Sequence, residues 1–281
     1  MIIVGVDGSA PSRAAVEWAA ADALRLRVPL RVVHAVDRSW YQVGRFPIED
    51  MPDTLLRNGR RVLREARELV HERQPGVEVT TLDAEGVPKV VLEDQAKDAT
   101  EIVVGSRGLG GIAGTLLGSV STHVAGHVRC PVVVVRGERP ATPYGEIAVG
   151  VDDSPECEPA LAYAFEQAKL RGSTLRVVHA WQLPVHAYAP GVTYDMDEVR
   201  VAQHQVVRDR LGIFAQDYPR VTVVEDVPHA HPVQAMTEAS RRADLVVVGS
   251  HGRGTLGSAL LGSVSRGTLH HAACPVAVVR A

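Results

Sequence analysis

Two loops of the sequence carry glycine and serine at the same spacing, a combination typical of a phosphate-binding loop. The first runs Gly105-Ser106-Arg107-Gly108, then nine residues, then Gly118-Ser119; the second runs Gly249-Ser250-His251-Gly252, then nine residues, then Gly262-Ser263. Glycine lets a ligand approach the backbone closely. Each closing serine stands where a helix is expected to begin, and free N–H groups there favour an anion. We therefore predict a phosphate cradle built from backbone amides and hydroxyl groups, without a lysine.

Two better-known phosphate motifs do not account for these loops. A P-loop requires glycine directly before lysine, and no glycine in the chain precedes a lysine. Gly252, Gly254 and Gly257 fit the spacing of the dinucleotide fingerprint. That fingerprint belongs to the first strand–helix turn, whereas these glycines follow the fourth expected strand. The match is interpreted as a consequence of glycine density, and NAD is not the expected ligand.

The elements that must position these loops alternate between strand and helix. Apolar, β-branched runs predict strands over residues 2–7, 30–36, 77–83, 101–105 and 131–136. Helices are expected after Ser9, which is suited to be an N-cap, over a face from Leu55 to Val70, and near 88–98 and 119–128. Such alternation predicts a parallel sheet with helices on both faces. Ligands of these sheets bind beyond the carboxyl ends of the strands, where Asp7 and Asp152 stand.

The chain contains a tandem duplication. Gly5-Val6-Asp7 returns 145 residues later as Gly150-Val151-Asp152, and Cys130-Pro131-Val132 returns 144 residues later as Cys274-Pro275-Val276. An offset that changes by one residue over the whole length indicates two copies of a domain rather than a stack of short repeats. We expect one domain over residues 1–137, a linker rich in Gly and Pro over 138–145, and a second domain over 146–281.

The paired glycine loops, the aspartate after the first strand and the Cys-Pro-Val segment of the last strand resemble the universal stress protein family, in its ATP-binding branch. The resemblance covers nearly the whole chain and is close to the tandem proteins of mycobacteria and other actinobacteria. It implies two Rossmann-like (adenine nucleotide alpha hydrolase-like) α/β domains. Each would hold a five-stranded parallel sheet of order 3-2-1-4-5 with helices on both faces.

The resemblance further implies one ATP, alone or with Mg, in each repeat. Val6 and Asp7 would meet the adenosine end, Ala35 would line the base pocket, and Val104 and Gly105 would lie near the ribose. The phosphates would be held by Arg107, Gly108, Gly118, Ser119 and Val120, with Ser121 as an added hydroxyl. The second site would use Val151, Asp152, Ala180, Val248, Gly249, His251, Gly252, Gly262, Ser263, Val264 and Ser265. Because His251 replaces the permanent charge of Arg107, we expect the second site to be weaker or more pH-sensitive.

The family resemblance implies a regulatory protein of stress adaptation and growth. No catalytic residue is assigned, because phosphoryl transfer needs a held metal and a group that orients the nucleophile, and the sequence repeats no candidate for either. Other interpretations stay open. One is slow ATP hydrolysis or autophosphorylation of Ser119, Ser121, Ser263 or Ser265. Another is a scaffold with a structural nucleotide, and a third is cyclic AMP as the ligand.

Composition argues against several other classes. A net charge of −3 and an aromatic content of 4% disfavour a nucleic-acid partner. Cys130, Cys157 and Cys274 form neither a disulfide framework nor a zinc motif, and no metal ligand from protein side chains is expected. The N-terminus does not have the pattern of a signal peptide, and no apolar run reaches membrane-spanning length. We therefore expect a cytoplasmic protein without a membrane partner.

Several side chains have a structural interpretation instead. His34 and His179 fall in expected strands and are interpreted as core histidines, and Cys130 and Cys274 as buried packing residues. Trp40, Tyr41, Trp181 and Tyr188 fall in the long loops after the second strand of each repeat, as lids over the nucleotide or as loop anchors. The apolar last strands are expected sheet edges, which invite pairing between the repeats or in a homodimer. A signalling partner of unknown identity is also expected.

Overall fold

The structure, a computed structural model, describes residues 1–37, 51–109, 117–136, 142–183, 195–214, 216–252 and 261–281. Trp40, Tyr41, Tyr188, Gly254 and Gly257, which the sequence singled out, lie outside these residues. The chain divides into two compact units, Met1–Arg136 and Gly137–Ala281. Each unit is described below by itself.

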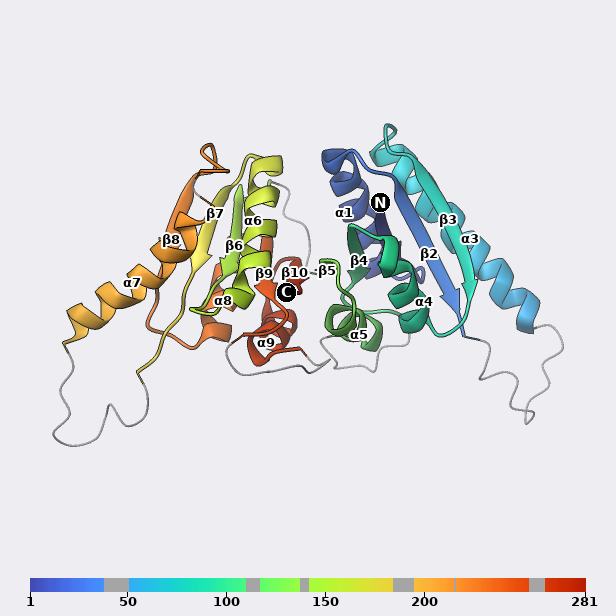
Figure 1. Cartoon of the computed structure of the whole chain (residues 1–281). Helices are drawn as coiled ribbons and strands as arrows, with labels where there is room; N and C mark the ends of the chain where they lie inside the picture. Colours follow the sequence, from blue (N-terminus) through green and yellow to red (C-terminus); the bar gives the residue numbers. More distant parts are fainter. Residues whose placement is uncertain (38–50, 110–116, 137–141, 184–194, 215, 253–260) are drawn as a thin grey trace, which may run out of the picture. The chain divides into compact units, whose positions relative to one another are not determined.

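The first unit alternates strands and helices as the sequence predicted (Figure 1). Its elements are β1 (Ile2–Gly5), α1 (Ala10–Leu26), β2 (Leu30–Val36), α3 (Met51–Arg73), β3 (Val79–Glu85), α4 (Pro88–Gln95), the 3₁₀ turn η1 (Ala96–Asp98), β4 (Glu101–Gly105), α5 (Ser119–His127) and β5 (Val132–Val135). All strand pairs of the unit are parallel, in the order β3-β2-β1-β4-β5. Helices α1 and α3 pack together on one face of this sheet, and α4 and α5 pack together on the other.

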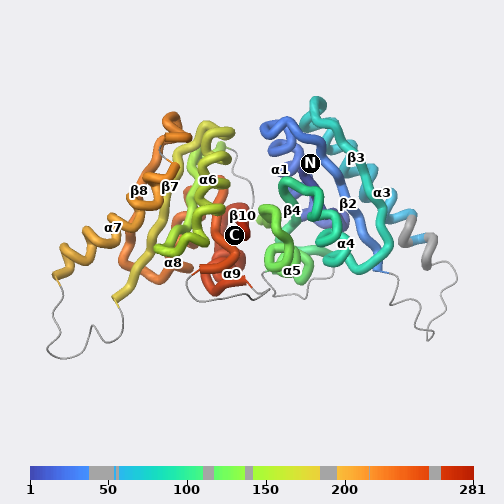
Figure 2. The backbone as a smooth tube through the Cα atoms, in the orientation of Figure 1, coloured from blue at the N-terminus to red at the C-terminus, as the bar shows by residue number. Residues whose placement is uncertain are grey.

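The second unit repeats this order. Its elements are β6 (Glu146–Gly150), the 3₁₀ turn η2 (Pro155–Cys157), α6 (Glu158–Arg171), β7 (Thr174–Val178), α7 (Met196–Gly212), β8 (Val223–Asp226), α8 (Pro232–Ala239), β9 (Leu245–Gly249), α9 (Ser263–His271) and β10 (Val276–Val279). The strands of this unit are also parallel, in the order β8-β7-β6-β9-β10. Figure 2 shows that the backbone follows the same course from strand to helix in both units. The predicted fold class and strand order are confirmed within each unit.

The strand interiors form the cores. Ile2, Ile3 and Val4 of β1 and Ile147, Ala148 and Val149 of β6 are fully buried. Strands covered on both faces by helices have no solvent side, which is why their sequences are continuously apolar rather than alternating. The interpretation of His34 and His179 as core histidines is confirmed, because both are buried and each ring nitrogen Nδ1 lies within hydrogen-bond distance of a backbone carbonyl.

Some predicted boundaries were wrong. The strand expected over 2–7 ends at Gly5, because Asp7 turns the chain by accepting the N–H of Ser9. The strand expected at 77–83 runs two residues later, from Val79, and the helix expected at 88–98 is divided into α4 and η1. Ser9 does cap α1, since its side chain accepts the N–H of Ser12. Cys274 is buried as predicted, but Cys130 is only half-buried.

Candidate functional site

Asp7 joins two loops at the carboxyl edge of the first sheet. Its Oδ1 accepts the N–H of Ser9 at 3.0 Å, which shapes the turn after β1. Its Oδ2 accepts the N–H of Leu109 at 2.8 Å, from the loop after β4. The structure thus brings together Asp7 and the Arg107–Gly108 loop, which lie about one hundred residues apart in the sequence.

Gly108 is needed for this approach. A Cβ atom at this position would collide with Oδ2 of Asp7. Gly105 is similarly confined, because a Cβ there would lie 2.7 Å from the backbone carbon of Pro11 in the first turn of α1. The predicted glycines therefore let β4 and its loop approach the carboxylate and the helix, which is a structural role in addition to any contact with a ligand.

The pKa of the Asp7 carboxyl is lowered. Burial acts in the opposite direction and is the largest single influence, but hydrogen bonds from Ser9, from the N–H of Leu109 and from Ser12 together outweigh it. Hydrogen bonds to the charged form favour that form. Asp7 is therefore a carboxylate at neutral pH, stabilised by hydrogen bonds from the Ser9 side chain and from the backbone amides of Ser9 and Leu109.

The second unit builds the same arrangement around Asp152. Its Oδ1 accepts the N–H of Ser154 at 3.0 Å and the hydroxyl of Ser154 at 2.6 Å. A Cβ atom on Gly252 would lie 2.9 Å from its Oδ2, so the loop after β9 approaches this carboxylate as its counterpart approaches Asp7. The two aspartates predicted from the repeat thus share the bond to the serine two residues on and the close approach of a glycine loop.

Helices α5 and α9 present bare N-termini beside these loops. Each begins at the predicted serine, Ser119 or Ser263, with a glycine as N-cap, and no side chain of the described residues caps it. The N-cap amides of Gly118 and Gly262 donate to the carbonyls of Ser106 and Ser250, each at 2.8 Å, which fixes the start of the helix against the glycine loop. First-turn N–H groups without an intrahelical partner favour an anion.

Ser121 and Ser265 have a different role from the one predicted. Each is buried and donates its hydroxyl proton, at 2.7 Å, to a carbonyl at the end of the preceding strand, that of Gly105 or Gly249. A hydroxyl has one proton to donate, so in this structure these serines fasten the helix to the sheet. Ser119 and Ser263, by contrast, are exposed.

The valines predicted to meet the adenosine and ribose are core residues. Val6, Val104, Val151 and Val248 are all buried. A ligand at the carboxyl edge of the sheet would therefore meet their backbone. Ala35, near the end of β2, and Ala180, two residues after β7, are half-buried. The carbonyls of Val6 and Val151 are held by Nδ1 of His34, at 2.8 Å, and of His179, at 3.1 Å.

The two units differ at the residue between the first two glycines. Arg107 is exposed. His251 is half-buried, and its Nδ1 lies 3.0 Å from the hydroxyl oxygen of Ser250. Arg107 and His251 therefore occupy equivalent positions in the glycine loops, with a permanent charge in the first unit and an imidazole in the second.

The sequence did not predict the contacts with backbone groups that hold the site together. The Leu109 amide is a backbone donor, and no residue type signals it. The histidines were assigned to the core, but their contact with the carbonyl preceding each aspartate was not predicted; the equal spacing of His34 and His179 from the aspartates could have suggested it.

The described residues contain no group of three or more His, Cys, Asp or Glu side chains placed to hold a metal ion. Among the same residues, no helix has both the length and the apolar character that crossing a bilayer requires.

Comparison with known proteins gives a consistent result. The model of the universal stress protein family matches residues 1–136 and again 143–280. Universal stress protein Rv2623 of Mycobacterium tuberculosis is 36% identical over 99% of this chain and 96% of its own length. Universal stress protein Rv2005c of the same organism is 37% identical with the same coverage. The crystal structure of a universal stress protein from Archaeoglobus fulgidus covers 99% of this chain and 96% of its own, with a TM-score of 0.71 and 20% identity, which shows a shared fold.

Proposed function

The chain belongs to the universal stress protein family, and from that premise and the site geometry we propose that each repeat binds one ATP molecule as a regulatory ligand. The proposed role is stress adaptation and growth regulation in the cytoplasm. The ATP-loaded chain would differ from the empty chain in shape or in partners, which requires that the two states differ in their affinity for ATP.

One observation carries this proposal: the same anion-binding arrangement occurs twice. In each unit an uncapped helix N-terminus, a glycine loop and an aspartate from the first strand meet at the carboxyl edge of a parallel sheet. This edge is where open α/β sheets bind ligands. The first-turn amides of α5 and α9 fit a phosphate, because their orphan donors need an acceptor.

The aspartates fit the other end of a nucleotide. Asp7 and Asp152 lie two residues beyond the first strand of each unit, and both are hydrogen-bond acceptors. Carboxylates would repel a phosphate, so they favour the adenosine end with its hydroxyl and amino donors. The proposed orientation is thus adenosine toward the first strand and phosphates toward α5 or α9.

Phosphoryl transfer is the enzymatic alternative to this proposal. In the proposal, any Mg²⁺ ion arrives with the nucleotide. The serine hydroxyls of Ser121 and Ser265 are bonded to backbone carbonyls, which leaves Ser119 and Ser263 as the exposed candidates for phosphoryl transfer. Single-turnover conversion of bound ATP to ADP at more than a trace rate would favour the enzymatic alternative.

The first experiment is to denature freshly purified protein, identify the released nucleotide and count it per chain. We expect adenine nucleotide, approaching two molecules per chain after saturation with ATP. Competition with cyclic AMP tests the alternative ligand. A cradle at a helix N-terminus should prefer the more highly charged triphosphate over a cyclic diester, so tighter binding of cyclic AMP would replace ATP in the proposal.

A further inference from the structure

Arg210, on α7 of the second unit, contacts the loop that carries Asp152. Its Nη1 lies 3.0 Å from Oε1 of Glu158, at the first residue of α6. Its Nη2 donates to the carbonyl of Asp153. Only 19% of the Arg210 side chain is exposed. One guanidinium therefore joins α7 to the start of α6 and to the turn after β6.

The bond to Asp153 acts on the geometry of the candidate site. Asp153 lies between Asp152, whose carboxylate faces the Gly252 loop, and Ser154, whose N–H and hydroxyl both donate to that carboxylate. Fixing the Asp153 carbonyl limits rotation of the peptide unit between Asp153 and Ser154, which carries the N–H that donates to Asp152. Arg210 thus fixes the turn that orients the Asp152 carboxylate toward the Gly252 loop.

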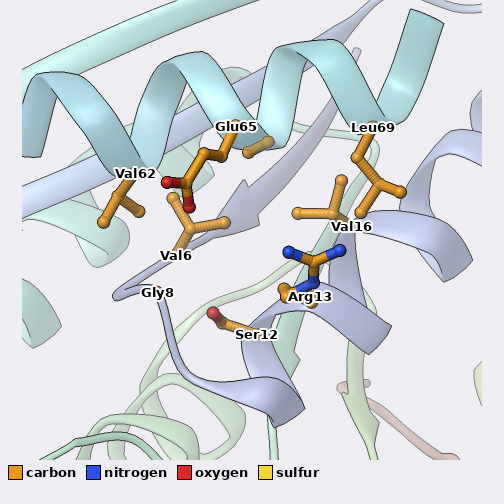
Figure 3. A pocket seen from close by; sticks show the side chains of 9 residues that line it. Val6, Gly8, Ser12, Arg13, Val16, Val62, Glu65 and Leu69 are labelled. Atoms are coloured by element: carbon orange, nitrogen blue, oxygen red, sulfur yellow. The ribbon is translucent and has the colours of Figure 1, made fainter. Parts of the chain in front are cut away.

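The first unit has the opposite arrangement of charges at the counterpart positions. Arg13 and Glu65 lie 145 residues before Glu158 and Arg210. Figure 3 shows both side chains pointing into a hollow between α1 and α3, which Val6, Gly8 and Val62 also line. The cavity volume is about 50 Å³, room for a water molecule or two and far below a nucleotide pocket.

In the second unit the Arg210–Asp153 bond acts as a clamp on the turn. Glu65 takes the place of Arg210 in the first unit, so this bond has no counterpart at that position. A carboxylate has no proton to donate at neutral pH, so Glu65 cannot hold the Gly8 carbonyl as Arg210 holds that of Asp153. Gly8 also has a φ of +87°, in the left-handed region, whereas no such value occurs at Asp153. The turns after β1 and β6 therefore differ in the backbone angle of their middle residue, Gly8 or Asp153. The turn after β6 is tied to its long helix by the Arg210 guanidinium, and Glu65 cannot make that bond at the equivalent position of α3.

We propose that Arg210 is a positioning residue of the second nucleotide site: its bond to the Asp153 carbonyl pre-organises Asp152 for the ligand. The inference rests on the proposed function. A site ordered before binding loses less conformational freedom when the ligand arrives, and so binds more tightly. Removing the clamp should weaken ATP binding at the second site and leave the first site unchanged.

The experiment separates the carbonyl bond from the ion pair. All variants are made in the full chain carrying Gly118→Glu, which blocks the first site, and ATP affinity is measured by calorimetry. Arg210→Met removes both interactions. Glu158→Gln removes the ion pair and keeps the donor to Asp153. Arg208→Met is the matched control, because Arg208 lies on the same helix, is 62% exposed, and pairs at 3.7 Å with Glu225.

We expect Arg210→Met to bind ATP about tenfold more weakly, equivalent to ~1.4 kcal/mol. Glu158→Gln and Arg208→Met should bind within about twofold of the parent, a difference of ~0.4 kcal/mol. Hydrogen exchange at the Ser154 amide should become faster in Arg210→Met and stay unchanged in Glu158→Gln. If Arg210→Met folds poorly, Arg210→Lys keeps the charge on a single ammonium, and we expect intermediate affinity from it.

Two results would overturn the inference. One is parental affinity in both Arg210 variants. The other is an equal loss in Glu158→Gln and Arg210→Met, since the ion pair and not the carbonyl bond would then be responsible. These results differ from failure of the proposed function, in which the wild-type chain binds no adenine nucleotide at either site and the inference falls with it.

Discussion

Gly118→Glu is the most direct perturbation of the proposed phosphate cradle. Gly118 is the N-cap of α5, with φ −77° and ψ 154°, an extended conformation open to any residue. A Cβ atom there would have its nearest neighbours at 3.4 Å, the Ser106 carbonyl oxygen, and at 3.5 Å, Cα of Arg107. Glutamate is therefore accommodated without backbone strain, and its charge lies at the positive end of the helix, where it favours folding by about 0.5 kcal/mol.

The same charge opposes a phosphate. A carboxylate about 5 Å from one phosphate charge, at an effective dielectric constant of about 20, is disfavoured by roughly 3 kcal/mol, which corresponds to about a hundredfold or greater loss of affinity. We therefore expect calorimetry to count two ATP molecules per wild-type chain, one in Gly118→Glu, one in Gly262→Glu and none in the double variant. Thermal unfolding midpoints should stay at or slightly above the wild-type value.

Gly118→Gln is the matched control, because it has nearly the same size without the charge. It should weaken the first site less than glutamate does, and the difference between the two variants should shrink as salt is added. Two ATP molecules bound to Gly118→Glu with unchanged affinity would refute the placement of phosphate at the start of α5, whatever the second site does.

Three further predictions follow from the same contacts. The folded pKa of Asp7 is lowered, so the stability that this carboxylate contributes is present above the ordinary pKa of 3.8 and is lost as pH falls toward the folded value. Acid titrations should show the wild type losing more stability below pH ~4 than Asp7→Asn. Equal acid sensitivity of the two proteins would contradict this. Ser121→Ala leaves the buried Gly105 carbonyl without its 2.7 Å donor and should lower the free energy of unfolding by about 1–2 kcal/mol, measured by urea titration beside the exposed control Ser119→Ala. His251→Arg, in the Gly118→Glu chain, restores a permanent charge and should tighten ATP binding at the second site; unchanged affinity would show that this position does not contact the phosphates.

Much of the fold was predictable because its determinants are local. A strand buried on both faces must be apolar throughout, which made β1, β2 and β4 visible, and Ser9 with Pro11 marked the start of α1. The duplication added a check, since every element had to occur twice. The strand ends were less predictable. Nothing in the residue types of Gly5-Val6-Asp7 marks where the strand stops, and the turn depends on the hydrogen bond from the Ser9 N–H to the Asp7 carboxylate.

The positions of the candidate site beside the strand ends were predictable, but the hydrogen bonds between its residues were not. Glycine and serine at a helix start indicated an anion site, yet the same glycines also make room for Asp7 and Asp152. Ser121 and Ser119 are the same residue type two positions apart, and only the turn of the helix directs one to the Gly105 carbonyl and the other to solvent. Backbone donors such as the Leu109 amide carry no signal in the sequence, because every residue except proline has one.

Comparison of the two units shows which parts of the site tolerate change. The hydrogen bond from the serine N–H to the aspartate, the glycine N-cap and the serine that fastens the helix occur in both. The charged side chains around them differ, with Arg107 against His251 and the Arg13 and Glu65 positions against the Glu158–Arg210 pair. In the proposed function, the shared backbone geometry allows each unit to hold a phosphate, and the differing side chains set the affinity of each site. We therefore expect the two sites to fill at different ATP concentrations. A chain with two unequal sites would respond to ATP over a wider concentration range than a chain with two equal sites.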